Sequence, residues 1–323
     1  MSESPQVTAV ICTHNRVGYL QACIDSLLLQ SVARPSYEIL VIDNASTDDT
    51  AALCRPLAER GDIRYVHEPV TGLSQARNTG WREARAPYVG YLDDDAKADQ
   101  TWIESALHSF NKVTPPPAWV GGPIDLDFEY DRPEWIDEDM SVALGKVDWG
   151  DTAHALLPHE RLGGGNSFYL KALLEDIGGF DTRLGRKGDL LLSGEETQLQ
   201  RRVENAGGAL YYHPGIRIFH HVPAARIRPS FFYRRYFWGG VTDYGIARTL
   251  GPKAQKTVDA TSREEASGRW GRLLSNVAAA AGLASSQHAR IRGRIYLSYV
   301  LGQVGGRFFK GRYFSADSSE SEP

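Results

Sequence analysis

Short β-branched runs and helical patterns alternate along the first half of the chain, and this rhythm limits the folds open to it. The runs Val7–Cys12 and Tyr37–Ile42 are apolar almost throughout, as expected of strands buried on both faces. Between them, Val17–Leu29 carries apolar residues at helical spacing. Strand, helix, strand, helix in this order predicts an α/β fold, a Rossmann-like and mostly parallel sheet flanked by helices.

The same rhythm continues to about residue 120 and returns after residue 160. Further strands are expected at Ile63–His67, Tyr88–Leu92, Ala118–Val120, Ala209–Tyr212 and Ile216–Phe219. Further helices are expected after the N-caps Ser46 and Thr47, with a bend near Pro56, and at Ser74–Ala84, Thr101–Asn111, Lys171–Ile177 and from Gly194 to Gly207. Residues 123–160 show no clear period, and so long a stretch is usually functional or mobile.

Composition excludes several classes of protein. With 42% hydrophobic and 24% charged residues, the chain is typical of a globular protein and not of a coiled coil or a disordered chain. No uncharged apolar run reaches the roughly 18 residues that a membrane span needs. The first six residues are polar and carry no secretory signal pattern, so a cytoplasmic location is expected. The three cysteines have no zinc-type spacing, and reduced core thiols are the simplest interpretation.

The net charge of −4 conceals a strong asymmetry. Residues 1–216 carry a balance of −14, whereas residues 217–312 carry +13. We therefore expect a catalytic domain at 1–223, a basic and mainly helical region at 224–315, and a disordered acidic tail at 316–323. The segment Ser230–Trp238, SFFYRRYFW, is open to three interpretations: a helix packed by its aromatics, an interfacial helix on an anionic membrane, or a nucleic-acid contact. The first is favoured, and no nucleic-acid partner is expected.

Asp93-Asp94-Asp95 at the end of an apolar strand is the strongest chemical signal. Adjacent carboxylates repel one another, and a divalent cation such as Mg²⁺ or Mn²⁺ removes the conflict. If the segment is extended, Asp93 and Asp95 point the same way and share the metal while Asp94 faces elsewhere. The alternative is a solvated acidic turn that caps the next helix.

Other candidates are ambiguous one by one. Asp43 either accepts hydrogen bonds from a base or ribose, or forms an Asx-turn. Arg77 either reaches a diphosphate or pairs with the acidic turn. Glu195-Glu196 is either a general base with a tuning partner or a pair of acids at a helix start. His220-His221 ends a strand, where one imidazole can complete a metal site.

Taken in order, these segments resemble the inverting family 2 glycosyltransferases, which have the nucleotide-sugar-binding GT-A fold. The blocks that carry the resemblance are VICTHNR (10–16), VIDNASTDDT (41–50), GLSQARNTG (72–80), YLDDD (91–95), GGGNSFYLKALLEDIGGFD (163–181), GEET (194–197) and FHHVP (219–223). They cover about residues 5–223 and leave the C-terminal hundred residues without a comparable match.

The resemblance implies a role for each matching position. Thr13, with Asn15 and Arg16, borders the nucleotide, and Asp43 accepts from its base. Asp93 and Asp95 meet the ribose and the metal, with Asp94 and Arg77 beside the diphosphate. Asn166 shapes the sugar and acceptor pocket. Glu196 is the base and Glu195 its partner, although the family pair is usually Glu-Asp. His220 or His221 joins the metal.

The implied reaction moves a sugar from a UDP-, dTDP- or GDP-sugar to a hydroxyl of a glycan, lipid-linked or other acceptor, with inversion and Mn²⁺ or Mg²⁺. Bacterial polysaccharide or glycoconjugate synthesis is the expected setting, on the inner face of the membrane if the basic region binds lipid; homo-oligomerisation is left open. The alternatives are a nucleotidyltransferase-like enzyme, whose glycine-rich phosphate loop is missing after the first strand, and a catalytically inactive glycan- or lipid-binding scaffold.

Overall fold

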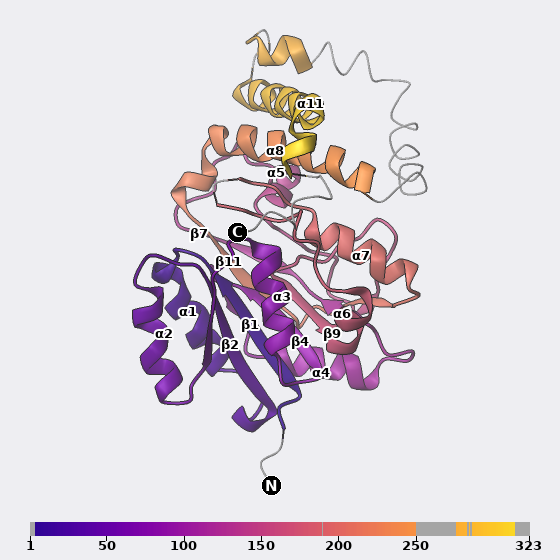
Figure 1. The fold of residues 1–323 in the computed structure, drawn as a ribbon. Helices are drawn as coiled ribbons and strands as arrows, with labels where there is room; N and C mark the ends of the chain where they lie inside the picture. The colour runs from indigo at the N-terminus through magenta and orange to yellow at the C-terminus, as the bar shows by residue number, and fades with distance from the viewer. Residues whose placement is uncertain (1–3, 189, 250–275, 283, 285, 314–323) are drawn as a thin grey trace. The chain divides into compact units, whose positions relative to one another are not determined.

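The computed structural model describes residues 4–188, 190–249, 276–282, 284 and 286–313, and the chain divides into two compact units (Figure 1). Unit 1 comprises Met1–Glu129, Leu144–Thr182 and Glu195–Val222. Unit 2 comprises Tyr130–Ala143, Arg183–Gly194 and Pro223–Pro323. The sequence predicted a catalytic domain at 1–223 and a separate basic region at 224–315, and this division of roles stays a prediction.

Unit 1 is built on an eight-stranded, mixed but mainly parallel sheet, which confirms the predicted fold class. Its strands follow the order β3-β2-β1-β4-β9-β6-β10-β8. They are β1 (Val7–Thr13), β2 (Tyr37–Asn44), β3 (Arg64–Glu68), β4 (Tyr88–Asp93), β6 (Trp119–Gly121), β8 (His154–Ala155), β9 (Asn166–Leu170) and β10 (Leu210–Tyr212). The first four run parallel to one another, and β9 pairs antiparallel with both β4 and β6.

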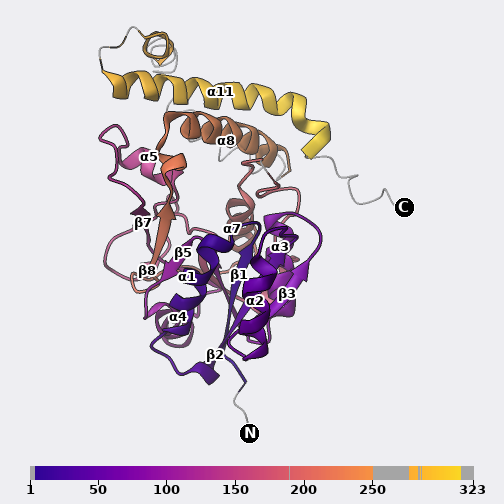
Figure 2. The same ribbon diagram turned by 90° about the vertical axis from the view of Figure 1, so that its left-hand side faces the viewer.

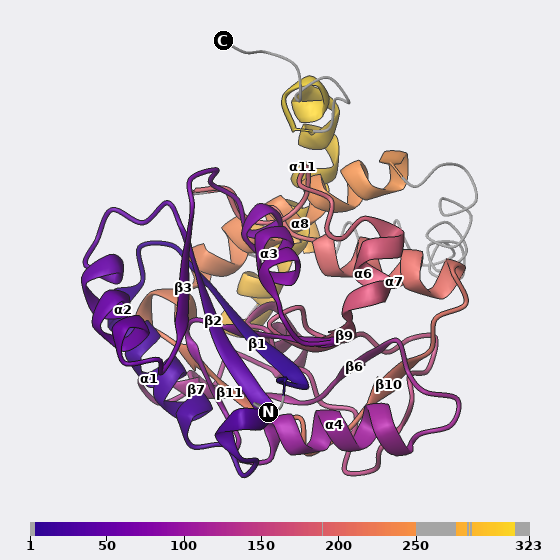
Figure 3. The same ribbon diagram turned by 60° about the horizontal axis from the view of Figure 1, so that its bottom comes forward.

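Helices cover both faces of this sheet, because successive strand residues point to opposite sides. Ile11 joins one hydrophobic cluster and its neighbour Val10 joins the other. Figure 3 shows α1 and α4 on one side of the sheet and α3, α6 and α7 on the other. The helices of unit 1 are α1 (Val17–Leu28), α2 (Thr50–Glu59), α3 (Leu73–Glu83), α4 (Trp102–Lys112), α6 (Lys171–Ile177) and α7 (Glu195–Asn205), with a short 3-10 turn η1 (Arg34–Ser36).

A second sheet of three strands, in the order β5-β11-β7, lies in the same unit. Its strands are β5 (Ala96–Ala98), β7 (Ile124–Phe128) and β11 (Ile218–Val222). Two expectations are corrected here. Residues 123–160 contain regular structure in β7, β8 and the short helix α5 (Glu138–Ala143). The last strand does not stop at Phe219, so His220 and His221 lie inside it.

The N-caps predicted for the second helix are also wrong. Helix α2 begins after Asp49, and the Asp48 carboxylate accepts a hydrogen bond from the Thr50 amide at 3.1 Å. The Ser46 hydroxyl accepts instead from the Asn15 amide at 3.0 Å. Ser46 and Thr47 therefore brace the loop after β1 and do not cap the helix.

Unit 2 contains α5, a 3-10 turn η2 (Ala224–Ile227), and the helices α8 (Pro229–Thr249) and α11 (Gln287–Tyr313), which lie along each other (Figure 2). Their backbones approach closely at glycines: a Cβ at Gly302 would collide with the Phe237 carbonyl oxygen. The SFFYRRYFW segment lies on α8, where Phe232 is fully buried with its ring 5.4 Å from that of Trp135. Its aromatics thus pack within unit 2.

The predicted tail at 316–323 falls outside the described residues. Among the helices that are described, none combines the length and the apolar character needed to cross a membrane.

Candidate active site

The polar residues expected at strand ends do gather at one edge of the sheet. Thr13 pairs in register with Asp43, and Cys12 pairs with Asp93, so β1, β2 and β4 all end at the same level. In parallel sheets, ligands bind beyond this carboxyl edge.

The acidic motif is a turn and not an extended segment. Strand β4 ends at Asp93, and Asp94 and Asp95 form the turn to β5. Arg16 Nη1 donates to Asp94 Oδ1 and Asp95 Oδ2, both at 2.8 Å, and Thr13 Oγ1 donates to Asp94 Oδ2 at 2.8 Å. The expected alternation, with Asp93 and Asp95 together and Asp94 apart, is therefore wrong. Burial raises the pKa of Asp94 to about 6, an effect that Arg16 opposes and Asp95 reinforces.

His220 lies against this turn. Its Nε2 is 3.3 Å from Asp95 Oδ1, and both side chains are mostly buried. Two ligands of one octahedral Mg²⁺, each at about 2.1 Å, stand about 3 Å apart, so this pair has a spacing that suits a shared cation.

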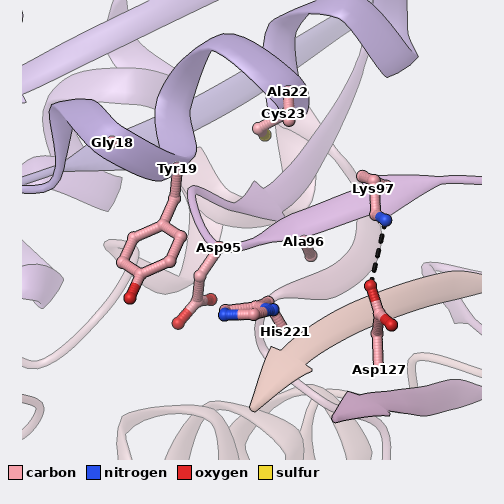
Figure 4. Close-up of a pocket in the computed structure, with 9 residues that line it drawn as sticks. All are labelled: Gly18, Tyr19, Ala22, Cys23, Asp95, Ala96, Lys97, Asp127 and His221. Atoms are coloured by element: carbon pink, nitrogen blue, oxygen red, sulfur yellow. Dashed lines mark ion pairs between the residues drawn. The ribbon is translucent and has the colours of Figure 1, made fainter. Parts of the chain in front are cut away.

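His221 lines a separate pocket of about 130 Å³ beside the same turn (Figure 4). Its ring centroid is 5.3 Å from that of Tyr19. Lys97 and Asp127, paired at 2.9 Å, form the opposite wall. The complete lining is Gly18, Tyr19, Ala22, Cys23, Asp95, Ala96, Lys97, Asp127 and His221.

One buried guanidinium joins the acidic turn to the start of α7. Arg77 Nη1 lies 2.9 Å from Glu195 Oε1, and Arg77 Nη2 lies 3.6 Å from Asp93 Oδ1. The side chains of Arg77 and Glu195 are 4% and 5% exposed, whereas that of Asp93 is 47% exposed. The sequence allowed a pairing of Arg77 with the acidic turn but gave no sign of Glu195, which is 118 residues away.

Glycines make this contact possible. A Cβ at Gly165 would overlap the Asp93 carboxylate, and one at Gly164 would stand 3.0 Å from Arg77 Nη1. The glycine-rich segment 163–165 therefore packs its backbone directly against the two charged groups.

Glu195 and Glu196 open α7 with contrasting surroundings. Burial raises the pKa of Glu195 to about 8, the charge of Glu196 adds to this, and Arg77 opposes it. Both Oε2 atoms are buried and accept no hydrogen bond from the described residues. The side chain of Glu195 is buried and that of Glu196 is half-buried, and the interaction between the two carboxyl groups favours a proton on Glu195.

Asp43 and Asn15 border the same edge. Asp43 Oδ1 accepts from the Ser46 amide at 3.0 Å and Oδ2 from the Tyr65 hydroxyl at 2.6 Å. Burial alone would raise the pKa of Asp43, but these hydrogen bonds outweigh it and lower the pKa. Asn15 adopts a positive φ of 53°, and its side-chain oxygen accepts from the Thr47 amide at 2.7 Å. Asn15 thus shapes the loop through backbone contacts.

Asn166 does not face this site with a free group. Its side chain is fully buried; Oδ1 accepts from Trp102 Nε1 at 2.7 Å, and Nδ2 donates to the carbonyls of Pro123 and Ile216 at 2.9 and 2.8 Å. Both amide protons are used inside the protein, so the predicted contact of Asn166 with the sugar is not supported by this geometry.

Within the described part of the chain, no three or more His, Cys, Asp or Glu side chains gather as a complete metal site. Asp95 and His220 are two potential ligands that lie together at the acidic turn. Sites of this kind take their remaining ligands from water and from substrate phosphates.

Comparison with known proteins points to one family of enzymes. Residues 8–149 match the family model described as "Glycosyl transferase family 2". The match covers somewhat less than half of the chain, and over this part the chain is similar to members of that family. A glucosyl-dolichyl phosphate glucuronosyltransferase of Haloferax volcanii is 28% identical over 73% of this chain and 75% of its own length. The succinoglycan biosynthesis protein ExoM of Rhizobium meliloti is 25% identical over 78% of each chain.

A solved structure has the same fold. The mannosyltransferase PcManGT of Pyrobaculum calidifontis, in complex with GDP-Man and Mn²⁺, superposes with a TM-score of 0.65 at 20% identity, over 95% of this chain and 88% of that one. The predicted GT-A fold is confirmed.

Two residues of the site escaped prediction from the sequence. Tyr65 on β3 donates to Asp43, and the buried Tyr169 hydroxyl on β9 accepts and donates no hydrogen bond among the described residues. Tyr65 lies in the mixed strand RYVHE and Tyr169 in the strand NSFYL, and neither local sequence marks its tyrosine as part of a site. Only the register of β3 beside β2 and of β9 beside β4 brings them to the site.

Proposed function

We propose that this protein is a glycosyltransferase that moves a sugar from a nucleotide-diphosphate donor to an acceptor hydroxyl with inversion, assisted by a divalent cation. The observation that carries the proposal is the Arg77 guanidinium, which contacts Asp93 on the acidic turn and Glu195 beside the proposed base. A fixed positive charge between these groups can offset the charge that develops on a departing diphosphate.

The donor nucleotide binds at the carboxyl edge of β1, β2 and β4. Asp43 has a carboxylate with further lone pairs, which can accept an N–H from uracil, thymine or guanine. Arg16 and Thr13 hold Asp94 and Asp95 in place beneath the diphosphate. That PcManGT binds GDP-Man supports a nucleotide-sugar donor, while UDP-, dTDP- and GDP-sugars all remain candidates.

The geometry fits a divalent cation held by Asp95 and His220, whose donor atoms are 3.3 Å apart. When bound, Mn²⁺ or Mg²⁺ would neutralise charge on the diphosphate. Asp93 is exposed and close to Arg77, and its role as a further ligand stays a prediction. We assign the metal role to His220, because its Nε2 lies 3.3 Å from Asp95 Oδ1.

Glu196 takes the proton of the acceptor hydroxyl as its oxygen attacks the anomeric carbon. The bond from that carbon to the diphosphate breaks, and the nucleoside diphosphate leaves from the opposite face. Glu195, buried and prone to carry a proton at neutral pH, donates a hydrogen bond to Glu196 and fixes its orientation. One of two adjacent carboxyl groups then stays ionised as the base.

The acceptor class is proposed from the relatives. One acts on a glucosyl-dolichyl phosphate and another serves succinoglycan synthesis, so a lipid-linked or glycan hydroxyl is the best supported acceptor. Self-association stays an open prediction.

The test is release of nucleoside diphosphate from a panel of nucleotide sugars with Mn²⁺. We expect slow hydrolysis of one donor and its acceleration by glycan or lipid-linked acceptors. Glu196→Gln should lose about 10²–10⁴-fold in turnover and keep donor binding. Glu204→Gln, an exposed glutamate on the same helix, is the matched control. Release of pyrophosphate from nucleoside triphosphates would favour a nucleotidyltransferase. Glycan binding without any turnover would favour the inactive scaffold.

A further inference from the structure

The exposed side of α11 in unit 2 carries a row of large apolar side chains. Leu301, Val304 and Phe308 are 61%, 48% and 84% exposed, and they recur at spacings of three and four residues, which places them on one face of the helix. The face extends toward the N-terminus through the half-buried Leu297 and the exposed Arg294. We call Arg294, Leu297, Leu301, Val304 and Phe308 the α11 stripe.

Packing within unit 2 leaves the stripe uncovered. The opposite side of α11 presents Ile291, Ile295, Gly302 and Gly306, all buried. There Gly302 meets α8, and Gly306 meets the ring of Tyr244. Apolar residues thus lie on both sides of the helix, and only one side is used inside the unit.

The charge around the stripe has one sign. Helix α11 contains six arginines and lysines and no aspartate or glutamate. Acidic side chains of the unit contact α11 away from Leu301: Asp137 and Asp139 pair with Arg292 at 2.8 and 2.9 Å, and Asp243 accepts a hydrogen bond from the Tyr299 hydroxyl at 2.7 Å. The exposed Arg294 and Arg307 therefore flank the apolar residues without a competing carboxylate on the helix itself.

We propose that the α11 stripe docks on the surface of an anionic lipid bilayer. An apolar face flanked by arginines suits the boundary between head groups and acyl chains. Basic residues near such a surface are attracted by the anionic head groups, and insertion of Leu301, Val304 and Phe308 adds the burial of their exposed apolar area. The described helices are too short or too polar to span, so the helix lies in the surface plane.

This proposal places the membrane contact on α11, inside the basic region 224–315, and not on the SFFYRRYFW segment. The aromatics of SFFYRRYFW are half-buried or buried in unit 2. The residues that can enter lipid are those of α11. The inference is independent of the transfer reaction, since it concerns only where the enzyme binds.

Vesicle flotation of the full chain tests it. Wild type should float with vesicles containing phosphatidylglycerol and not with pure phosphatidylcholine, and high salt should weaken the binding. The variant Leu301→Gln/Val304→Gln/Phe308→Ser should lose at least tenfold in bound fraction. Leu29→Gln, which alters a residue 66% exposed in unit 1, is the matched control and should float like wild type.

A second measurement keeps the proposal falsifiable if the triple variant folds poorly. In anionic vesicles with brominated lipid, Phe308→Trp should show more quenching of tryptophan fluorescence than wild type, whose seven tryptophans give the background. Quenching no greater than that of wild type, or equal flotation of the triple variant, would overturn the proposal. So would a homodimer in solution that the triple variant converts to a monomer without any change in flotation, because the stripe would then bind a second copy.

Discussion

Arg16 and Arg77 each hold a pair of carboxylates in unit 1, and the contrast between them separates the parts of the site. Arg16 binds Asp94 and Asp95, which are neighbours in the turn, and its side chain is 30% exposed. Arg77 binds Glu195 and Asp93, which come from different elements, and its side chain is 4% exposed.

The difference in exposure has a chemical consequence. A partly exposed arginine on an acidic turn can yield its place to a cation or a substrate phosphate. A buried arginine cannot be replaced by water, and it fixes the distance between the donor side and the base. We therefore expect that a bound cation or a substrate phosphate can take the place of Arg16 on the acidic turn. We expect that neither can take the place of Arg77 beside Glu195.

Replacing Arg77 should have the largest effect on stability. Arg77→Met leaves the buried Glu195, whose carboxyl group carries a proton at neutral pH, without its hydrogen-bond partner, a change that typically costs about 1–3 kcal/mol. Urea unfolding measures it, with Arg82→Met, an exposed arginine on the same helix, as control. Arg77→Met/Glu195→Met should recover most of the loss. If Arg77→Met alone is as stable as Arg82→Met, the buried Glu195 does not depend on the Arg77 guanidinium.

Nucleotide binding should distinguish the carboxylates held by Arg16 from those held by Arg77, and replacing Asp95 tests this. Asp95→Asn should weaken Mn²⁺-dependent binding of a nucleoside diphosphate by about 10–100-fold. This corresponds to a loss of about 1.4–2.7 kcal/mol in binding free energy. Glu195→Gln should leave that affinity unchanged, because Glu195 contacts Nη1 of Arg77, whereas Asp93 of the acidic turn lies by Nη2. Calorimetry with GDP, UDP and dTDP gives both values. If the two variants lose the same amount of affinity, the carboxylates held by Arg16 and by Arg77 belong to one binding site.

Much of the fold could be predicted because its signals are local. The strand from Val7 and the helix from Lys171 follow from apolar runs and periodicity, and the acidic turn follows from its composition. The predicted alternation of the three aspartates failed because the strand stops at Asp93, and periodicity does not locate strand ends to a single residue.

The connections within the site are not local, and so they could not be predicted. Nothing in the neighbourhood of Arg77 points to Glu195, and nothing near Asn166 points to the carbonyl groups of Pro123 and Ile216 that use its amide. These contacts follow from the packing of α3 and α7 on the same face of the sheet and from the register of β9.

The pH dependence of stability should report the Glu195 cluster. The pKa of Glu195 is raised to about 8 in the folded state from an ordinary value near 4.5. Its protonated form therefore stabilises the fold fully below pH 4.5, and this contribution is lost as the pH rises toward 8. The slope is at most about 1.4 kcal/mol per pH unit for one proton. The charges of Arg77, Glu196, Asp93 and Tyr169 surround Glu195. The variants whose melting curves are compared must therefore leave these four residues unchanged.

Melting curves of wild type and Glu195→Gln between pH 5 and 8 provide that comparison. The variant should lose less stability with rising pH than wild type does, whereas Glu204→Gln should follow wild type. Parallel curves for wild type and Glu195→Gln would mean that Glu195 is ionised throughout, and then it cannot donate a hydrogen bond to Glu196.

The smallest effect is expected at Arg16, and its response to metal is the sharpest test of the contrast. Arg16→Met should cost about 1 kcal/mol, less than a fully buried pair, because Arg16 is partly solvated and Thr13 and His220 still contact the two aspartates. Mn²⁺ at about 100 times its dissociation constant stabilises a folded protein by about 2.7 kcal/mol, enough to restore the variant. The same metal should not restore Arg77→Met relative to wild type, since Glu195 lies on the other side of the guanidinium. Thermal melts of both variants in EDTA and in Mn²⁺ decide this. If Mn²⁺ restores both variants or neither, Arg16 and the cation do not share Asp95, and the assignment of the exchangeable cluster fails.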